Sequence, residues 1–346
     1  MRTTLIPRPL TRLALSLAAL VLTSGPAVPA DAPPGFTETV SVAARELTVY
    51  NLIGEVRLEP HAGSGFEVIV KAGGRDANRD SLKLDVKEES GSGSRVTVVF
   101  PVDSQTSYVY PALGRGSSTT FNLDGKHRKQ NDGWMAALGS FFSGWSGAEI
   151  KVRGSGSGAE MWADLVVRVP RGATLNVEHG VGKLLANGVD GELHLQAHSG
   201  SVTVTDCRGA RLEIATGSGE IKVEGVAVDA LELATGSGSV DALALKVGSA
   251  DVGTGSGSVD LSLESTGSGA IEVATGSGGI RIALPESAAA HVEAATGSGG
   301  ISVEGFEGAK VRRDSDHELE VEIGGGGGPR VELATGSGSI TIRSRR

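Results

Sequence analysis

The chain has one cysteine, twelve prolines and few aromatic residues, which make up 4% of its 346 residues. A single cysteine, Cys207, cannot form an internal disulfide, so packing and hydrogen bonds must stabilise the fold. Twelve prolines are too few for a polyproline linker protein, and the absence of a G-X-Y period excludes collagen. The net charge of −9 argues against a nucleic-acid partner, because such proteins normally present a basic surface. No apolar run of ~18 residues follows residue 30, so we expect no transmembrane helix beyond that point.

The first 30 residues are predicted to be a signal peptide. Arg2, Arg8 and Arg12 form a positively charged start, residues 13–22 are apolar, and small residues lead to Ala30. This pattern is typical of a secretory signal that is cleaved after Ala30; the alternative is a buried N-terminal helix. Cleavage removes three arginines and no acid, which changes the net charge from −9 to −12. We therefore expect an exported protein that is periplasmic, exposed on the cell surface or secreted.

Glycine is abundant, with 52 residues, and much of it follows a repeat. The tetrapeptide Thr-Gly-Ser-Gly begins at Thr216, Thr235, Thr254, Thr266, Thr275, Thr296 and Thr335. Its last glycine recurs every 19 residues from Gly219 to Gly257, every 21 residues from Gly257 to Gly299, and after 39 residues at Gly338; the copy at Thr266 is out of register. A period near 20 that is sustained over this length indicates a solenoid.

Each unit reads as two strands and two turns, and it contains no helical pattern. In residues 220–238, Ile221 and Val223 alternate with polar residues, Gly225 interrupts, and Leu231 and Leu233 alternate again. We therefore expect an all-β, single-stranded parallel β-helix, a right-handed β-solenoid with rungs of about 19–21 residues that stack ~4.8 Å apart. The repeated Thr and Ser hydroxyls are expected to form ladders that satisfy amides at the corner. The predicted inward residues are Val202, Val204, Leu212, Ile214, Ile221, Val223, Leu231, Leu233, Ile271, Val273, Ile280, Ile282, Ile301, Val303, Val331 and Leu333.

Four regions follow from these patterns. Residues 1–30 are the signal peptide, 31–102 are degenerate rungs, 103–148 are an aromatic-rich insert, and 149–346 are the regular solenoid with its Thr-Gly-Ser-Gly corners. Among the degenerate rungs, residues 82–98 are expected to repeat the two-strand unit. The strand at 339–342 is expected to be the exposed last edge, where the arginines that follow it would oppose end-to-end stacking.

The exported start, the glycine-centred repeat and the stretch from Val167 to Leu175, Val-Arg-Val-Pro-Arg-Gly-Ala-Thr-Leu, carry a family resemblance. The chain resembles the bacterial putative-adhesin family of exported β-strand-repeat proteins, a domain of unknown function. The resemblance covers roughly residues 40–346. It implies a β-solenoid fold and an adhesin-like role, and it implies no catalytic residues. The long insert departs from the compact form that is usual in the family.

The insert holds seven of the thirteen aromatic residues. Trp134, Leu138, Phe141 and Trp145 are spaced to lie on one face of a helix, which Asn131 or Asp132 could cap. Such a helix could cover the flank or end of the solenoid. It could also bind a partner or make a peripheral membrane contact. A disordered loop is the third alternative, since three glycines weaken the helical pattern.

One outward position of the repeat is acidic in every well-kept rung. Six places before the corner glycine lie Glu213, Glu232, Asp251, Glu272, Glu293 and Glu332. The line could be a solvated face that keeps the repeat soluble, or a face that binds a divalent cation such as calcium or a basic ligand. His194 holds the same position one rung earlier, so it could pair with Glu213 at a metal site or lie on the surface. Asp314-Ser315-Asp316 resembles the start of a calcium loop without its glycine. Cys207 is either a small turn residue or an exposed thiol.

The sequence contains none of the catalytic motifs that it could be compared with. G-x-S-x-G and H-E-x-x-H are absent, and Thr-Gly-Ser-Gly lacks the lysine of a phosphate loop. We therefore expect a non-enzymatic exported scaffold or adhesin-like interaction protein with an envelope or surface ligand. We expect no cofactor, although the acidic line could bind calcium. The alternatives are a polysaccharide-active β-helix enzyme, and an envelope-stress or membrane-associated sensing protein that uses the aromatic insert.

Overall fold

The computed structural model describes residues 35–89, 93–122, 149–325 and 327–345. The predicted signal peptide and the four residues of the predicted helix, Trp134, Leu138, Phe141 and Trp145, lie outside these ranges. Within them, no helix has the length and apolar character needed to cross a membrane.

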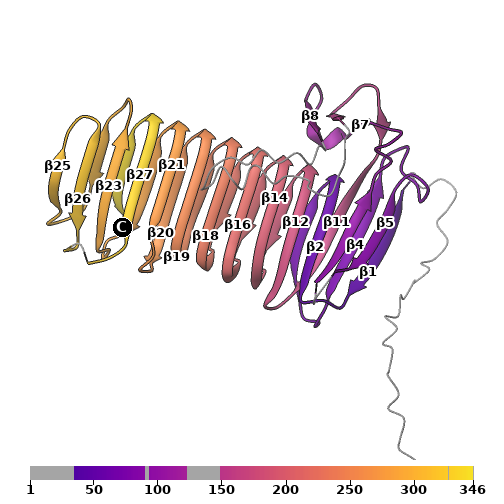
Figure 1. Ribbon diagram of the computed structural model, residues 1–346, viewed down its shortest axis with the longest axis horizontal. Coiled ribbons are helices and arrows are strands. Elements are labelled where there is room, and N and C mark those ends of the chain that lie inside the picture. The colour runs from indigo at the N-terminus through magenta and orange to yellow at the C-terminus, as the bar shows by residue number, and fades with distance from the viewer. Residues whose placement is uncertain (1–34, 90–92, 123–148, 326, 346) are drawn as a thin grey trace, which may run out of the picture.

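The described strands form an elongated solenoid with two opposed faces (Figure 1). Twenty-four described strands belong to one continuous hydrogen-bonded sheet that winds through both faces. Along the first face the order is β5 (Lys83–Glu88), β6 (Gly93–Val99), β2 (Glu46–Ile53), β12 (Ala173–Val181), β14 (Gly191–Ser199), β16 (Arg208–Ser218), β18 (Ala227–Ser237), the second half of β19 (Val240–Ser256), β21 (Ile271–Ser277), β27 (Arg330–Ser337), β23 (Ala290–Thr296), β26 (Glu318–Ile323) and β25 (Lys310–Asp314).

The second face is built from the strands that follow the corner of each rung. Its order is β1 (Phe36–Val42), β4 (Phe66–Gly73), β11 (Trp162–Pro170), β3 (Val56–His61), β13 (Leu184–Asn187), β15 (Val202–Thr205), β17 (Ile221–Glu224), the first half of β19, β20 (Val259–Thr266), β22 (Ile280–Pro285), β28 (Ile340–Arg345) and β24 (Ile301–Glu304). The pairings from β3 to β24 are parallel, which confirms the predicted β-solenoid.

Period-two alternation places aliphatic side chains between the two faces. Fourteen of the sixteen predicted inward residues are buried. The other two, Ile301 and Val303, are half-buried because they lie on β24, the last strand of the second face, which has a neighbour on one side only.

The corner between the faces explains why the repeat needs glycine. Gly238 has φ +150°, and a Cβ there would lie 2.0 Å from the carbonyl oxygen of Gly219 in the preceding rung. Inward threonines complete the corner, since Thr235 Oγ1 donates to Gly219 O at 3.1 Å and Thr254 Oγ1 donates to Gly238 O at 2.9 Å. The predicted role of these hydroxyls was therefore wrong in one respect, because they satisfy corner carbonyls rather than amides.

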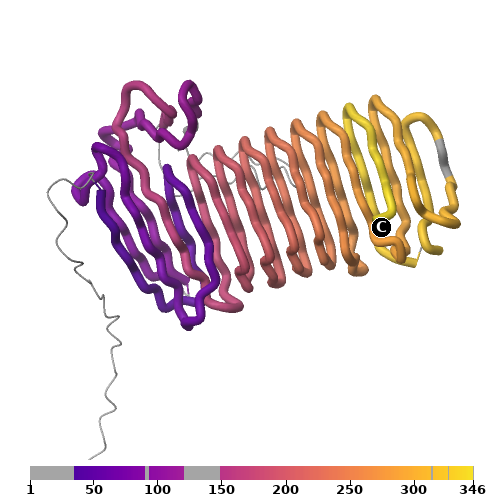
Figure 2. The backbone as a smooth tube through the Cα atoms, turned by 180° about the vertical axis from the view of Figure 1, so that it is seen from behind, coloured from indigo at the N-terminus to yellow at the C-terminus, as the bar shows by residue number. Residues whose placement is uncertain are grey.

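The last rung in the sequence is not the last rung of the stack. Strands β27 and β28 lie between the rung of β21 and β22 and the rung of β23 and β24 (Figure 2). The hairpin of β25 and β26 accounts for this order. Because β26 pairs antiparallel with β23 along its outer edge, the next strand, β27, can reach β23 only along the inner edge. The expectation that residues 339–342 form an exposed terminal edge was wrong.

The N-terminal end departs from the regular rungs in a similar way. β2 and β3 form a rung that lies between β6 and β12 on one face and between β11 and β13 on the other. Residues 82–98 were predicted as a further rung, but their strands instead pair antiparallel, β5 with β6, on the first face alone. β4 likewise pairs antiparallel with β1 and β11, so antiparallel strands close this end.

The predicted insert and the start of the predicted regular region share a small separate sheet. Its order is β10 (Ala159–Glu160), β7 (Ser107–Val109), β9 (Glu149–Arg153) and β8 (Ser118–Asn122), with the short 3-10 helix η1 (Pro111–Leu113) beside it. It projects from the N-terminal end of the solenoid (Figure 1). Tyr108 packs edge-on against Phe100 with ring centroids 5.8 Å apart, which anchors the small sheet to the core.

Candidate functional site: an acidic groove on the first face

The six predicted carboxylates lie in one row across the first face. Register pairs Glu213 with Glu232, Glu232 with Asp251, and Asp251 with Glu272. The row continues to Glu332, Glu293 and Glu320, in that order. Glu332 precedes Glu293 because β27 is inserted before β23.

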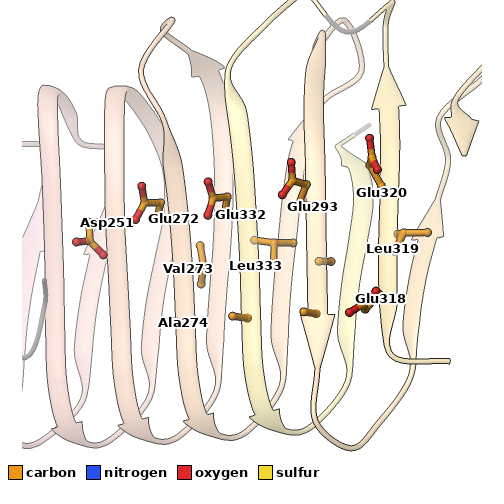
Figure 3. A pocket seen from close by; sticks show the side chains of 13 residues that line it. Asp251, Glu272, Val273, Ala274, Glu293, Glu318, Leu319, Glu320, Glu332 and Leu333 are labelled. Carbon is orange, nitrogen blue, oxygen red and sulfur yellow. The ribbon is translucent and has the colours of Figure 1, made fainter. Parts of the chain in front are cut away.

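The C-terminal part of the row opens into a groove of about 730 Å³. Its carboxylates are those of Asp251, Glu272, Glu332 and Glu293 from the row, with Glu318 and Glu320 from β26 (Figure 3). Beside each acid of the row the next outward residue is small, as at Ala274, Ala334 and Ala295, all of which line the groove. A line of methyl groups beside a line of longer acidic side chains leaves the surface hollowed there.

Sequence reasoning missed Glu318 and Glu320. Both lie on β26, whose alternation in residues 318–323 marks it as a strand, but the antiparallel turn that brings it beside β23 has no counterpart in the repeat.

Cations neutralise the two ends of the row. At one end, Arg211 Nη2 lies 2.6 Å from Glu232 Oε2 and its Nε lies 3.6 Å from Glu213 Oε2. At the other end, Arg330 contacts Glu332 at 2.6 Å and Glu293 at 3.1 Å. His291 Nε2 adds a contact of 3.2 Å to Glu293.

The centre of the row has no such neighbours. The arginines lie two residues before their acids, and at the same place before Glu232, Asp251 and Glu272 the chain has Ala230, Ser249 and Ala270. Within the part of the chain that the structure describes, Asp251 and Glu272 have no basic partner. Burial, and then repulsion by Glu232 and Glu272, raises the pKa of Asp251. The electrostatic potential along the row is thus most negative at its middle.

His194 lies between two carboxylates. Its Nδ1 lies 2.9 Å from Glu213 Oε2 and its Nε2 lies 3.2 Å from Glu192 Oε1. The hydrogen bond to Glu213 raises the pKa of His194, and the same bond lowers the pKa of Glu213. The pair is therefore an ion pair when the imidazole is protonated.

The described residues contain no group of three His, Cys, Asp or Glu side chains that could together hold a metal ion. Calcium takes six to eight oxygen ligands, whereas a row offers its carboxylates in a line. The calcium face stays a prediction.

Two other predicted features have structural roles. Cys207 is buried, and burial raises the pKa of its thiol to about 11, so it is the small turn residue rather than the exposed thiol. Ser315 lies in the turn that joins β25 to β26, where its amide donates to Glu318 O at 2.9 Å. The segment of residues 314–316 therefore closes a hairpin.

Comparison with solved structures finds similar proteins at low identity. A putative adhesin from Bacteroides fragilis is 11% identical, with 91% of this chain and 98% of that chain covered and a TM-score of 0.43. A putative adhesin from Parabacteroides distasonis is 12% identical, with 90% and 97% covered and a TM-score of 0.33. A putative cell adhesion protein from Clostridium sporogenes is 10% identical, with 90% and 100% covered and a TM-score of 0.28.

No curated protein matches the chain. The family model described as Toastrack DUF4097, in contrast, matches residues 128–343, more than half of the sequence. This match agrees with the resemblance that the repeat and the stretch from Val167 to Leu175 carry. The chain belongs to the Toastrack DUF4097 family.

Proposed function

We propose that this protein is an exported, non-enzymatic scaffold that binds a basic segment of a partner in the acidic groove of its first face. The observation that carries the proposal is the pair Asp251 and Glu272, which lie side by side with no cation beside them among the described residues, while both ends of the same row are neutralised. Adjacent carboxylates at the ~4.8 Å spacing of strands repel each other by ~1 kcal/mol even at the dielectric constant of water. A ligand with positive charges at this place would relieve that repulsion.

The shape of the groove favours an extended ligand over a single ion. The carboxylates of the row are arranged along the solenoid, one per strand, and the alanines beside them leave room for a backbone or a long side chain. A repeat scaffold is suited to this role, because stacked rungs fix the spacing of the outward groups along the whole face.

The binding proposal is tested by fluorescence anisotropy with a labelled octalysine peptide. The double variant Asp251→Asn/Glu272→Gln removes two charges from the centre of the row. The control, Glu220→Gln/Asp241→Asn, removes one charge directly before β17 and one from the first half of β19, both outside the groove, and gives the same net charge. We expect the groove variant to weaken binding by about tenfold, or ~1.4 kcal/mol, and the control to change it little. Equal weakening by both variants, or no binding by the wild type, would contradict the proposal.

Calcium is tested on the same variants. A rise in the melting temperature with calcium over a chelator control, lost in the groove variant, would show that the row serves a divalent cation instead.

The exported location is tested by protease treatment of intact source cells, with antibody detection and a lysed control. Cleavage in intact cells would show surface exposure and support an adhesin-like role. Protection until the outer barrier is broken would support an internal envelope scaffold, and a full-length cytoplasmic protein that retains residues 1–30 would refute export.

A further inference from the structure

A second cleft, far from the acidic groove, lies where the small sheet meets the second face of the solenoid. It has a volume of about 500 Å³. Its floor is the outward side of β11 with the neighbouring residues Glu55, Arg57 and Lys71, and its wall is the segment 110–112. The lining residues come from four parts of the sequence, which no single repeat contains.

Two aromatic rings converge in this cleft. Trp162 lies opposite Gly73 in the pairing of β11 with β4, and a Cβ at Gly73 would come within 2.8 Å of the indole. The missing side chain therefore lets the indole lie against the strand. Tyr110 packs against Trp162 with ring centroids 5.9 Å apart and the planes tilted by 53°. The two rings are thus held in a fixed orientation at the junction.

Polar groups surround the rings, and their charges balance. Asp164 lies opposite Lys71 in the register of β11 with β4, and its Oδ1 accepts a hydrogen bond of 2.8 Å from the Glu55 amide. Arg57 Nη2 lies 2.6 Å from Glu55 Oε1. The cleft therefore holds two acids and two bases that neutralise each other.

The tyrosine hydroxyl adds a neutral donor. Burial, followed by the charges of Asp164 and Glu55, raises the pKa of Tyr110 to about 12. The phenol therefore stays protonated at any physiological pH, and it can donate a hydrogen bond.

We propose that this junction cleft binds a neutral carbohydrate. Aromatic rings contact the apolar C–H faces of a sugar, while carboxylate, amine, guanidinium and phenol groups exchange hydrogen bonds with its hydroxyls. A site without net charge gives no electrostatic advantage to an acidic or a basic ligand. The regular rungs carry almost no aromatic residues, whereas this cleft brings the rings of Tyr110 and Trp162 together with the carboxylates of Glu55 and Asp164. The inference does not depend on the acidic groove, which lies on the other face.

The test is titration calorimetry of the full mature chain with cellotetraose, maltotetraose and chitotetraose, and with tetragalacturonate as a charged comparison. We expect at least one neutral tetrasaccharide to bind. Trp162→Ala and Asp164→Asn should each weaken that binding by about tenfold or more. Asp241→Asn, which removes a carboxylate from β19 outside both this cleft and the acidic groove, should leave it unchanged.

Asp164→Asn keeps the shape of the side chain, so it remains informative if Trp162→Ala fails to fold. A second measurement uses the variant Trp134→Phe/Trp145→Phe, in which Trp162 is the remaining tryptophan. Its fluorescence should change when the binding tetrasaccharide is added. The proposal is overturned if none of the neutral sugars binds at millimolar concentration, if Asp164→Asn binds as the wild type does, or if tetragalacturonate binds more tightly than every neutral sugar.

Discussion

Replacing Thr235 by valine tests whether the hydrogen bond between the corner threonine and the carbonyl of the preceding rung stabilises the solenoid. Thr235 is fully buried, and its hydroxyl donates to Gly219 O at 3.1 Å. Valine has nearly the same shape and is equally branched at Cβ, so packing and strand preference change little. What is lost is the donor, and the corner carbonyl then faces a methyl group.

The expected cost follows from two opposing effects. A buried acceptor left without its partner costs ~1–3 kcal/mol. Burial of a methyl group in place of a hydroxyl returns up to ~0.8 kcal/mol. We therefore expect Thr235→Val to lower the free energy of unfolding by about 1–2 kcal/mol. The triple variant at Thr216, Thr235 and Thr254 should lose more than the single one, because each hydroxyl serves a different corner.

The assay is equilibrium unfolding in urea, with hydrogen exchange of β16 and β18 as a local measurement. The matched control is Thr203→Val on β15, whose side chain points outward and makes no hydrogen bond with other described residues. A Thr235→Val protein that is as stable as the Thr203→Val protein would refute the corner hydrogen bond as a stabilising contact.

Four further results are expected. Gly238→Ala should destabilise the fold more than Gly300→Ala in a thermal melt, because its Cβ would lie 2.0 Å from Gly219 O whereas nothing lies within 4 Å at Gly300; similar melts would contradict the steric reasoning. Deleting residues 327–346 removes four buried aliphatic side chains from inside the stack, each of which stabilises the fold by ~1.5–3 kcal/mol. Limited proteolysis should therefore cut residues 305–325 faster in the truncated chain than in the full chain. Unchanged protection would argue against the inserted rung. Burial lowers the pKa of His179 to about 4. Between pH 6.5 and 4 the unfolded chain therefore binds a proton at His179 that the native chain does not bind, so up to about 3 kcal/mol of stability should be lost as the pH falls through that range. His179→Gln should remove this pH dependence of the free energy of unfolding. His194 should show the opposite pH dependence, because its hydrogen bond to Glu213 raises its pKa. Its stabilising effect is complete below the pKa of the unfolded chain, near 6.5, and is lost as the pH rises through the pKa of the folded chain. The difference in free energy of unfolding between the wild type and His194→Gln, measured against pH, should show this loss.

The local parts of the fold and of the acidic row were predictable, because both depend on short-range periodicity. Alternation along a strand decides which side chains point inward, and a constant period places equivalent residues one above another. The row from Glu213 to Glu272 follows from these two rules alone. The cations at its ends could also have been found, since Arg211 and Arg330 each precede an acid of the row by two residues.

What the sequence did not reveal is the order of rungs with equivalent corners. Gly299 follows Gly278 by 21 residues, the same spacing that separates Gly257 from Gly278, so direct stacking satisfies the repeat equally well. The decision comes from the hairpin of β25 and β26, which occupies the outer edge of β23. The same hairpin supplies Glu318 and Glu320 to the groove, and for that reason those two residues were missed together with the rung order.

The inserted rungs and the antiparallel strands solve one problem at both ends of the solenoid. A regular parallel stack ends in strands with unpaired amides and carbonyls, which can template the pairing of another chain. Here β1 with β4 and β5 with β6 close the N-terminal end, and β25 with β26 close the first face at the other end. β25 carries the exposed cations Lys310 and Arg312, and β24, the last strand of the second face, is only four residues long. The most regular rungs, including the last rung in the sequence, lie inside the stack. The repeat can therefore be nearly identical from rung to rung without exposing a regular strand edge on which a second copy of the chain could pair.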